Sequence, residues 1–156
     1  NLSTNRQKPL SNVREECSMQ EEALLAAGWQ KGEGGGFVEL VGPFWFRGDH
    51  LDFRMAFVAD AKHRNRRDVV QGGMLATLAD RAMGQAGRLA NGDRAHATIQ
   101  LDLHYIDAVR IGELVEARCS VVRRTHAVIF IEADILADER LVAKAKGIWK
   151  VLGDAA

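Results

Sequence analysis

One helical segment stands alone in a chain that is otherwise patterned for strands. From Gly72 to Ala90 apolar residues recur at helical spacing, and Asn91-Gly92 supplies a stop signal. Farther along, apolar and polar residues alternate, which predicts four strands, at 96–106, 112–124, 126–137 and 140–152. Their short links favour an antiparallel meander. One long helix beside about six antiparallel strands is an α+β architecture whose helix covers one face of the sheet.

The region before this helix is patterned more weakly. Residues 1–18 are polar and are expected to form a flexible arm, and residues 19–156 are expected to form a single domain. Three elements are expected ahead of the long helix: a short helix at Glu21–Trp29 and strands at Phe37–Leu40 and Leu51–Ala59. The segment Asp60–Asp68 is a strongly basic loop that leads directly into the helix.

Composition excludes several classes of function. The 21 Lys and Arg residues balance the 21 Asp and Glu residues, so no overall field attracts nucleic acid or an anionic membrane. No apolar run approaches the roughly 20 residues that span a bilayer. Cys17 and Cys119 are far apart, which favours a reducing, cytoplasmic location over a disulfide. The histidines lack ligand spacing, so no metal is expected.

The long helix has two unlike faces. An apolar stripe that suits the sheet consists of Leu75, Leu78, Ala79, Ala82, Ala86 and Leu89. The other face gathers small residues around one carboxylate: Gly73, Ala76, Asp80, Gly84 and Gly87. Each interior glycine costs a helix roughly 1 kcal/mol relative to alanine, so something packs closely there. A second subunit, a ligand and tight helix-on-sheet packing without a ligand all remain open.

The start of the helix has the outline of a site for acyl groups. Gly72 and Gly73 open the helix, where unpaired peptide N–H groups are donors for an oxyanion. Asp80 lies two turns farther on and has the chemistry either to activate a water or to attack a carbonyl. These residue types together predict acyl transfer or hydrolysis.

An ordered set of short motifs carries a family resemblance. They are His63-Arg64-Asn65, Gly72-Gly73, Leu78-Ala79-Asp80, Thr98 and Gly112 to Glu116. With these motifs the chain, from about residue 37 to residue 152, resembles the hotdog-fold acyl-CoA thioesterases of the phenylacetate-pathway type. The resemblance implies a curved antiparallel sheet wrapped around the helix, dimers joined at their sheet edges, and often tetramers. It also implies hydrolysis of an acyl-CoA thioester, with coenzyme A as part of the substrate and no separate cofactor.

The resemblance also implies roles for individual residues. Asp80 becomes the catalytic carboxylate, Gly72 the oxyanion-hole amide, Asn65 an orienting amide and Thr98 a hydroxyl partner. Gln71 stands where the family usually has His, and it retains an N–H donor but carries no proton or positive charge. A second departure is Asp68, where Gly is common; it puts a negative charge near the site unless Arg66 or Arg67 neutralises it.

Basic residues beside this site suit the phosphates of coenzyme A. Candidates for contacts with the substrate are Gly73, His63, Arg66, Arg67, Arg123 and Arg124. The first four lie at or just before the start of the helix, whereas the last two are suggested only by the resemblance. A solvated surface is the alternative for all of the charged members of this group.

Spacing along the helix predicts a shared site. Gly73 and Asp80 are seven residues apart, which at about 1.5 Å per residue separates their backbones by roughly 10 Å. If both ends of this segment act on one thioester, they come from different chains, and a homodimer is required for catalysis. A hotdog protein that binds acyl-CoA without hydrolysing it is the main alternative. A hydratase ranks last because the helix carries no His.

Overall fold

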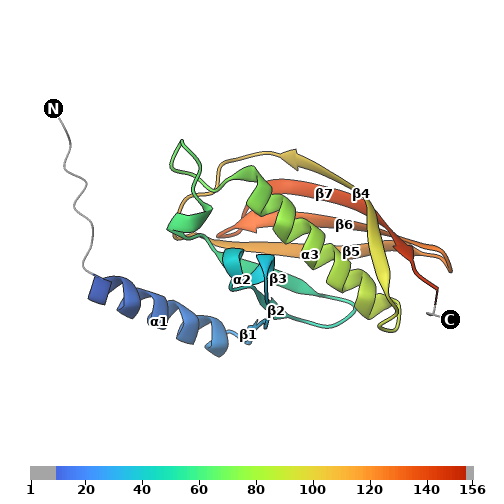
Figure 1. Cartoon of the computed structure of the whole chain (residues 1–156), viewed down its shortest axis with the longest axis horizontal. Helices are drawn as coiled ribbons and strands as arrows, with labels where there is room; N and C mark the ends of the chain where they lie inside the picture. The colour runs from blue at the N-terminus through green and yellow to red at the C-terminus, as the bar shows by residue number, and fades with distance from the viewer. Residues whose placement is uncertain (1–9, 154–156) are drawn as a thin grey trace.

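The computed structural model describes the backbone of residues 10–153 and the side chains of residues 18–153 (Figure 1). Its helices are α1 (Leu10–Ala26), α2 (Phe37–Val41) and α3 (Gly72–Ala90), with a 3-10 turn at Ala61–His63. Its strands are β1 (Gln30–Lys31), β2 (Trp45–Arg47), β3 (Arg54–Val58), β4 (His96–Tyr105), β5 (Leu114–Arg124), β6 (Val128–Ala137) and β7 (Arg140–Val151). They form one curved antiparallel sheet around α3, which is the hotdog fold. The short strands β1 and β2 were not predicted.

The order of strands in the sheet is β1-β2-β3-β5-β6-β7-β4. The bounds predicted for the last four strands are correct within two residues at every end. The predicted meander is correct only for β5, β6 and β7, because β4 pairs with β7 and β5 pairs with β3. The link between β4 and β5 crosses the end of the sheet and is held there by the Val70 N–H, which donates to the Val109 carbonyl at 2.8 Å. Strand β4 therefore lies at one edge.

The N-terminal region departs most from the sequence predictions. Helix α1 begins at Leu10 and ends at Ala26, so the predicted boundary between arm and domain falls inside a helix, and residues 1–9 lie outside the described part. The predicted strand at Phe37–Leu40 is wrong, because this segment is the short helix α2, closed where the Gly42 N–H donates to the Val38 carbonyl. A short apolar run fits either structure.

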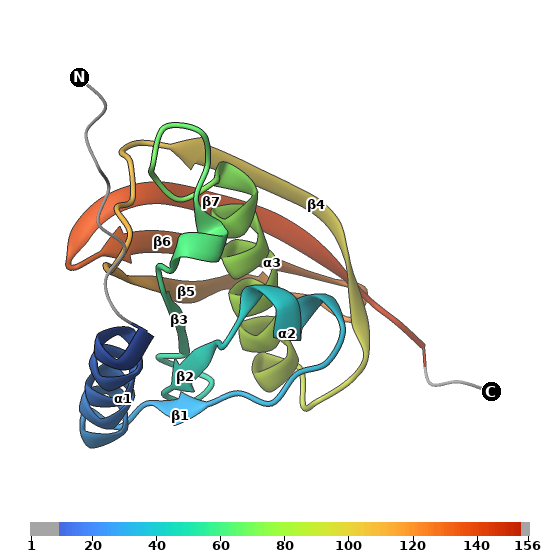
Figure 2. The ribbon, with the colours of Figure 1, turned by 60° about the vertical axis from the view of Figure 1, so that its left-hand side comes forward.

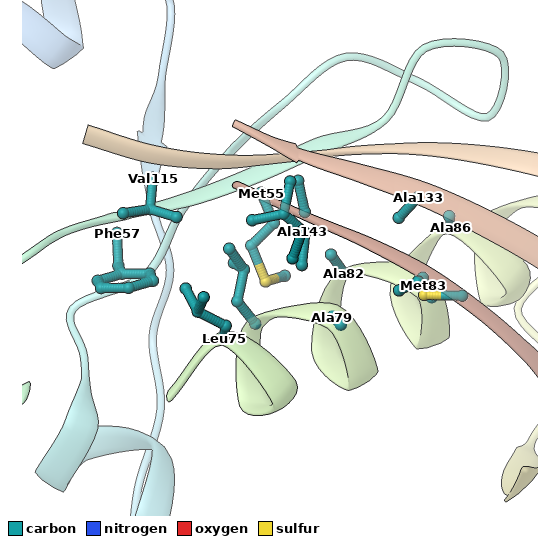
Figure 3. Packing of buried hydrophobic residues seen from close by; sticks show 14 of the residues in the cluster. Met55, Phe57, Leu75, Ala79, Ala82, Met83, Ala86, Val115, Ala133 and Ala143 are labelled. Carbon is teal, nitrogen blue, oxygen red and sulfur yellow. The ribbon is translucent and has the colours of Figure 1, made fainter. Parts of the chain in front are cut away.

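Small side chains allow α3 to lie close to the concave face of the sheet. Ala79, Ala82 and Ala86 on α3 face Ala133 and Ala143 on the strands (Figure 3). The buried residues of α3 are Met74, Leu75, Leu78, Ala79, Ala82, Met83, Ala86 and Gly87. Five of the six stripe residues predicted from the sequence are among them, whereas Leu89 is only half-buried. Alanine on both surfaces brings the backbones together without leaving cavities.

One of the two glycines farther along the second face of α3, Gly87, is explained by this close packing. A Cβ at Gly87 would lie 2.8 Å from Cδ1 of Ile131, and a Cβ at Gly84 would lie 3.5 Å from Nε1 of Trp149. A side chain at Gly87 would therefore collide with the protein's own sheet, whereas Gly84 is half-buried and a Cβ there would make only an ordinary van der Waals contact. Gly73 is exposed and Asp80 is half-buried, so the part of the face near the helix start is open.

A buried carboxylate joins the N-terminal strands to the main sheet. Glu116 on β5 is only 6% exposed and accepts hydrogen bonds from Arg54 on β3 and from Arg118, each at 3.0 Å. Arg47 on β2 lies 3.9 Å from the same carboxylate and stacks over the ring of Trp29. A buried charge needs such partners, because an unpaired one costs several kcal/mol.

We predict that Gly147→Ala destabilises the fold by about 1–3 kcal/mol, the usual cost of overpacking. A Cβ at this position on β7 would lie 2.7 Å from the Gln100 carbonyl oxygen of β4 and 2.7 Å from the ring of Trp149. The matched control is Gly35→Ala, where a Cβ meets nothing within 4 Å. Urea unfolding measures both variants, and equal midpoints would contradict this account of β4.

Candidate active site

Gln71 caps the start of α3 and leaves one glycine amide open. Its side-chain oxygen accepts the Gly73 N–H, and its backbone carbonyl accepts the Met74 N–H at 2.9 Å. Within the described part of the chain no acceptor contacts the Gly72 N–H. The expected contact between Gly73 and a substrate therefore competes with an existing cap, whereas the Gly72 N–H is available. Because Gln71 uses its oxygen, its NH2 group remains a donor beside that amide.

Tyr105 at the end of β4 supports the same helix start, and the sequence analysis missed it. Its hydroxyl donates to the Gly72 carbonyl at 3.1 Å, and a Cβ at Gly72 would lie 3.3 Å from its ring. The side chain is nevertheless 56% exposed. An exposed aromatic ring therefore forms a wall next to the open amide. Only the sheet register could have indicated this contact, because 33 residues separate the two.

Asp80 and Thr98 are brought together across the gap between α3 and β4. The Thr98 hydroxyl donates to Oδ1 of Asp80 at 2.7 Å. Register along β4 shifts just beyond this point, so that Thr98 lies opposite Trp149 while Gln100 lies opposite Ile148. This irregularity keeps Thr98 on the concave side of the sheet. Asp80 is half-buried and Thr98 is exposed, so the pair is open to a molecule arriving at the edge.

Asn65 organises the loop before α3. Its backbone N–H donates to the Val69 carbonyl at 2.8 Å, and its side-chain oxygen accepts the Arg67 N–H at 2.7 Å. This contact uses only the side-chain oxygen, so the two N–H donors of Nδ2 remain available. Asp68 has a positive φ of 60° that closes the turn, and its carboxylate bonds Arg64 at 3.3 Å. Arg64, rather than Arg66 or Arg67, is the arginine that pairs with Asp68.

His63 has a different role from the predicted contact with coenzyme A. The ring is 5% exposed and packs edge-to-face on Phe57. Its Nδ1 accepts the Asp60 N–H at 2.9 Å, and its Nε2 lies 2.7 Å from the Val41 carbonyl oxygen, to which it donates. Nε2 therefore fastens the loop to the end of α2, while Nδ1 closes the 3-10 turn within the loop. Burial lowers the pKa of His63 below 6.5, which favours the neutral ring.

The other candidate basic residues lie at two ends of the molecule. Arg66 and Arg67 are exposed on the loop before α3. Arg123 is exposed near the hairpin between β5 and β6, and Arg124 donates to the Ala90 carbonyl at 3.3 Å at the end of α3. The 19-residue helix separates these two groups by about 27 Å (Figure 1). Within one protomer they cannot contact the same phosphate.

Strand β4 leaves one edge of the sheet unpaired within the described chain. It pairs only with β7, and apolar side chains near its two ends are exposed: Ile99 at 59%, Tyr105 at 56% and Ile106 at 52%. An unpaired strand of ten residues is a ready template for another strand. Both parts of the candidate site, the Asp80–Thr98 pair and the Gly72 amide beside Tyr105, lie along this edge.

Groups for other chemistries are scarce in the described residues. Burial raises the pKa of the Cys119 thiol to about 12, which suppresses the thiolate needed for a nucleophile. Within residues 18–153 no group of three or more His, Cys, Asp or Glu side chains is arranged to hold a metal ion. Among the described helices none combines the length and apolar character of a membrane span.

Comparisons with known proteins identify relatives. The family model of the thioesterase superfamily matches residues 68–144. A Pseudomonas aeruginosa protein named "Putative esterase PA0474" is 32% identical over 114 residues, which cover 72% of this chain and 85% of that protein. The solved structure of the conserved protein PA5202 from the same species is 31% identical, covers 76% of this chain and 95% of its own, and has a TM-score of 0.70. A hypothetical thioesterase from Streptococcus pneumoniae TIGR4, solved with coenzyme A, shares the fold at 18% identity, with coverages of 72% and 88% and a TM-score of 0.63.

We predict that His63 makes the stability of the fold pH-dependent. Because burial lowers its folded pKa, the unfolded chain binds the proton more readily, so the stabilisation is complete above pH 6.5 and is lost as the pH falls below it. Wild-type protein should therefore lose more stability between about pH 7.5 and about pH 5.5 than His63→Gln does, as measured by urea unfolding. His126→Gln, at an exposed position, is the control. Equal losses in all three proteins would exclude this role.

Proposed function

Because the chain belongs to the thioesterase superfamily, we propose that it hydrolyses acyl-CoA thioesters at a site shared between two protomers. The observation that carries the proposal is the Thr98–Asp80 hydrogen bond beside an unpaired strand edge. One protomer supplies Gly72 and Asn65, and its partner supplies Asp80 and Thr98. Superfamily membership and the esterase name of a relative support ester or thioester hydrolysis in general; the acyl-CoA substrate and the roles below are our inference.

The distance along α3 supports the division between protomers. From Gly72 to Asp80 the helix rises eight residues, or about 12 Å, whereas groups that act on one carbonyl must lie within about 3 Å of their target atoms. A pair of β4 edges joined about a two-fold axis places the partner's Asp80 opposite the first protomer's Gly72. The same contact covers the exposed apolar residues of the edge, Ile99 and Ile106. A homodimer, or a dimer of such dimers, is the working assembly.

Each group then has a defined chemical task. The thioester carbonyl oxygen accepts the Gly72 N–H, whose donor strength is increased by the positive end of the helix. Asp80 takes a proton from a water whose oxygen attacks the carbonyl carbon; the carbon–sulfur bond then breaks, and the leaving thiolate takes that proton from Asp80, which regenerates the carboxylate. Thr98 fixes the rotamer of Asp80 through its hydrogen bond. Asn65 offers its Nδ2 donors to the water or the carbonyl. Direct attack by Asp80 to form an anhydride is the other possible route.

Gln71 stands where the family that this chain resembles usually has a histidine, and it can perform only part of the role of that residue. Its oxygen already caps Gly73, so its NH2 group is the part that reaches a substrate carbonyl. A neutral amide polarises a carbonyl but transfers no proton. We therefore assign the proton transfers to Asp80 and water, and only hydrogen bonding to Gln71.

The basic residues at opposite ends of α3 support a coenzyme A substrate. Pairing of two β4 edges reverses the direction of the partner's helix, so Arg66 and Arg67 of one protomer approach the end of the other that carries Arg123 and Arg124. Four cations at one mouth suit phosphate groups. A superfamily structure solved with coenzyme A is consistent with this ligand class.

The free thiol of Cys119 favours a reducing compartment such as the cytoplasm.

A binding protein without turnover is the second candidate, and Gln71 is the observation that favours it. Loss of the histidine leaves fewer groups for proton transfer at the helix start. Thiol release from a panel of acyl-CoAs separates the two functions, because a sensor or carrier binds the thioester and releases no thiol.

We predict that Asp80→Asn lowers kcat for thiol release at least about a hundredfold, the usual contribution of a general base. The amide retains the shape and the hydrogen bond to Thr98 while removing the proton acceptor. Size-exclusion chromatography should show the same assembly as wild type. Asp102→Asn, an equivalent change on the outer face of β4, is the control and should leave the rate unchanged. Near-normal turnover by Asp80→Asn would eliminate the mechanism.

Mixed assemblies test whether the site is shared. Asp80→Asn and Asn65→Ala are each expected to be inactive, but a mixed dimer contains one complete site. After random exchange of equal amounts, activity should recover to about one quarter of wild type, since half of the dimers are mixed and each has one of two sites intact. Exchange is verified with two differently tagged chains. If tagged mixed dimers form and activity stays at the level of the separate variants, both groups act within one chain.

A further inference from the structure

A cavity lies on the side of α3 that is turned toward α2. Its volume is about 270 Å³, and it is bounded by the segment from Lys31 to Gly34, by α2 and by Phe44. The two views agree that α2 lies beside α3 (Figure 2). Arg81, the residue after Asp80, projects into this cavity from α3. Neighbouring residues on one helix thus face different surroundings, because successive side chains are about 100° apart.

Arg81 is held in this cavity without an acidic partner. Its guanidinium lies over the ring of Phe44, with Cζ 5.1 Å from the ring centroid. Its Nε–H is enclosed and has no hydrogen-bond acceptor, and the side chain forms no ion pair in the described part of the chain. Burial lowers the pKa of Arg81, while the nearby charge of Asp80 opposes that shift. Arginine nonetheless remains charged at neutral pH, so an unmatched cation is kept in a half-buried position.

The other cations of the cavity already have acceptors. Lys62 donates to the Gly42 carbonyl, and Lys31 forms an ion pair with Glu21 at 2.7 Å. Arg81 is thus the cation of the cavity that has no protein acceptor. A planar guanidinium matches a carboxylate, and the neighbouring ring of Phe44 and the side chain of Val38 suit a short apolar chain attached to it.

We propose that this cavity binds a small carboxylate-bearing molecule or group through Arg81. Glu33 and Glu39 line the rim, so a singly charged anion is favoured over a phosphate dianion. The cavity is large enough for a few carbon atoms beyond the carboxylate but not for a nucleotide. This site does not depend on the proposed thioester chemistry. Its carboxylate comes either from a free acid or from the far end of the acyl group of a thioester.

Nuclear magnetic resonance of the arginine Nε–H groups tests the site in the full chain. Sodium butyrate is titrated at constant ionic strength against sodium chloride, and the Arg81 signal is identified by its loss in Arg81→Gln. We expect a saturable shift of that signal. Arg81→Lys keeps the positive charge but loses the planar set of N–H donors, so it should bind butyrate at least about tenfold more weakly. Arg88→Gln, an exposed position on the same helix, is the matched control and should bind like wild type.

The variant Glu39→Gln is expected to bind butyrate more tightly than wild type. This test does not depend on whether the Arg81 variants fold. Removing a negative charge from the rim should tighten butyrate binding by about threefold at low salt. The absence of a saturable shift in wild type would overturn the proposal, as would butyrate affinity that is unchanged in folded Arg81→Gln. Unchanged affinity in Glu39→Gln would also count against this cavity as the place of binding.

Two thioesters distinguish the sources of the carboxylate. The acyl group of butyryl-CoA ends in a methyl group, and that of succinyl-CoA ends in a carboxylate at the same position. If the acyl group supplies the carboxylate, Arg81→Gln lowers kcat/KM for succinyl-CoA about tenfold or more and leaves butyryl-CoA unchanged. Unchanged turnover of both, together with butyrate binding that requires Arg81, identifies a free acid as the ligand. Failure of all thioester turnover would reject the proposed function while leaving the butyrate result intact.

Discussion

The close approach of α3 to the sheet is the constraint on which the rest of the structure depends. Ala79, Ala82 and Ala86 face alanines of the strands, and Gly87 lies where a Cβ would contact Ile131. Larger side chains at these positions would lift the helix and separate Asp80 from β4. The hydrogen bond between Asp80 and Thr98 therefore depends on packing by buried residues of α3 and of the sheet. A core without voids also transmits small displacements directly to the site.

Because β4 lies at the edge of the sheet, the groups that it places beside α3 are exposed. Because the chain passes through α3 between β3 and β4, the strand that follows the helix joins the far edge of the sheet beside β7. One side of β4 supplies Thr98 and Tyr105 to α3, while its outer edge stays unpaired within the described chain. The open Gly72 amide and the carboxylate consequently share one surface. Closure of that surface by a second protomer would complete the site and protect the edge.

Local contacts hold the start of α3 and the loop before it. Gln71 is a helix cap that occupies the Gly73 amide and leaves the Gly72 amide available. Asp68 adds a negative charge that Arg64 neutralises within the same loop. His63 fastens this loop to α2 through Nε2 and closes the turn within the loop through Nδ1. Arg81, the next residue after Asp80, lines the cavity beside α2, so two adjacent residues of one helix face different surroundings.

The sequence by itself determined the bounds of α3 and of the last four strands, because their hydrophobic periods are long and regular. It also identified the partnership of Asp80 and Thr98, although only through a resemblance to known thioesterases. The tertiary structure decided that Phe37–Val41 is helical, that β4 pairs with β7 and that His63 is buried. Tyr105 and Arg81 likewise emerged only from the fold. Each of these outcomes depends on contacts between distant parts of the chain, and local patterns of polarity do not contain the distances that such contacts require.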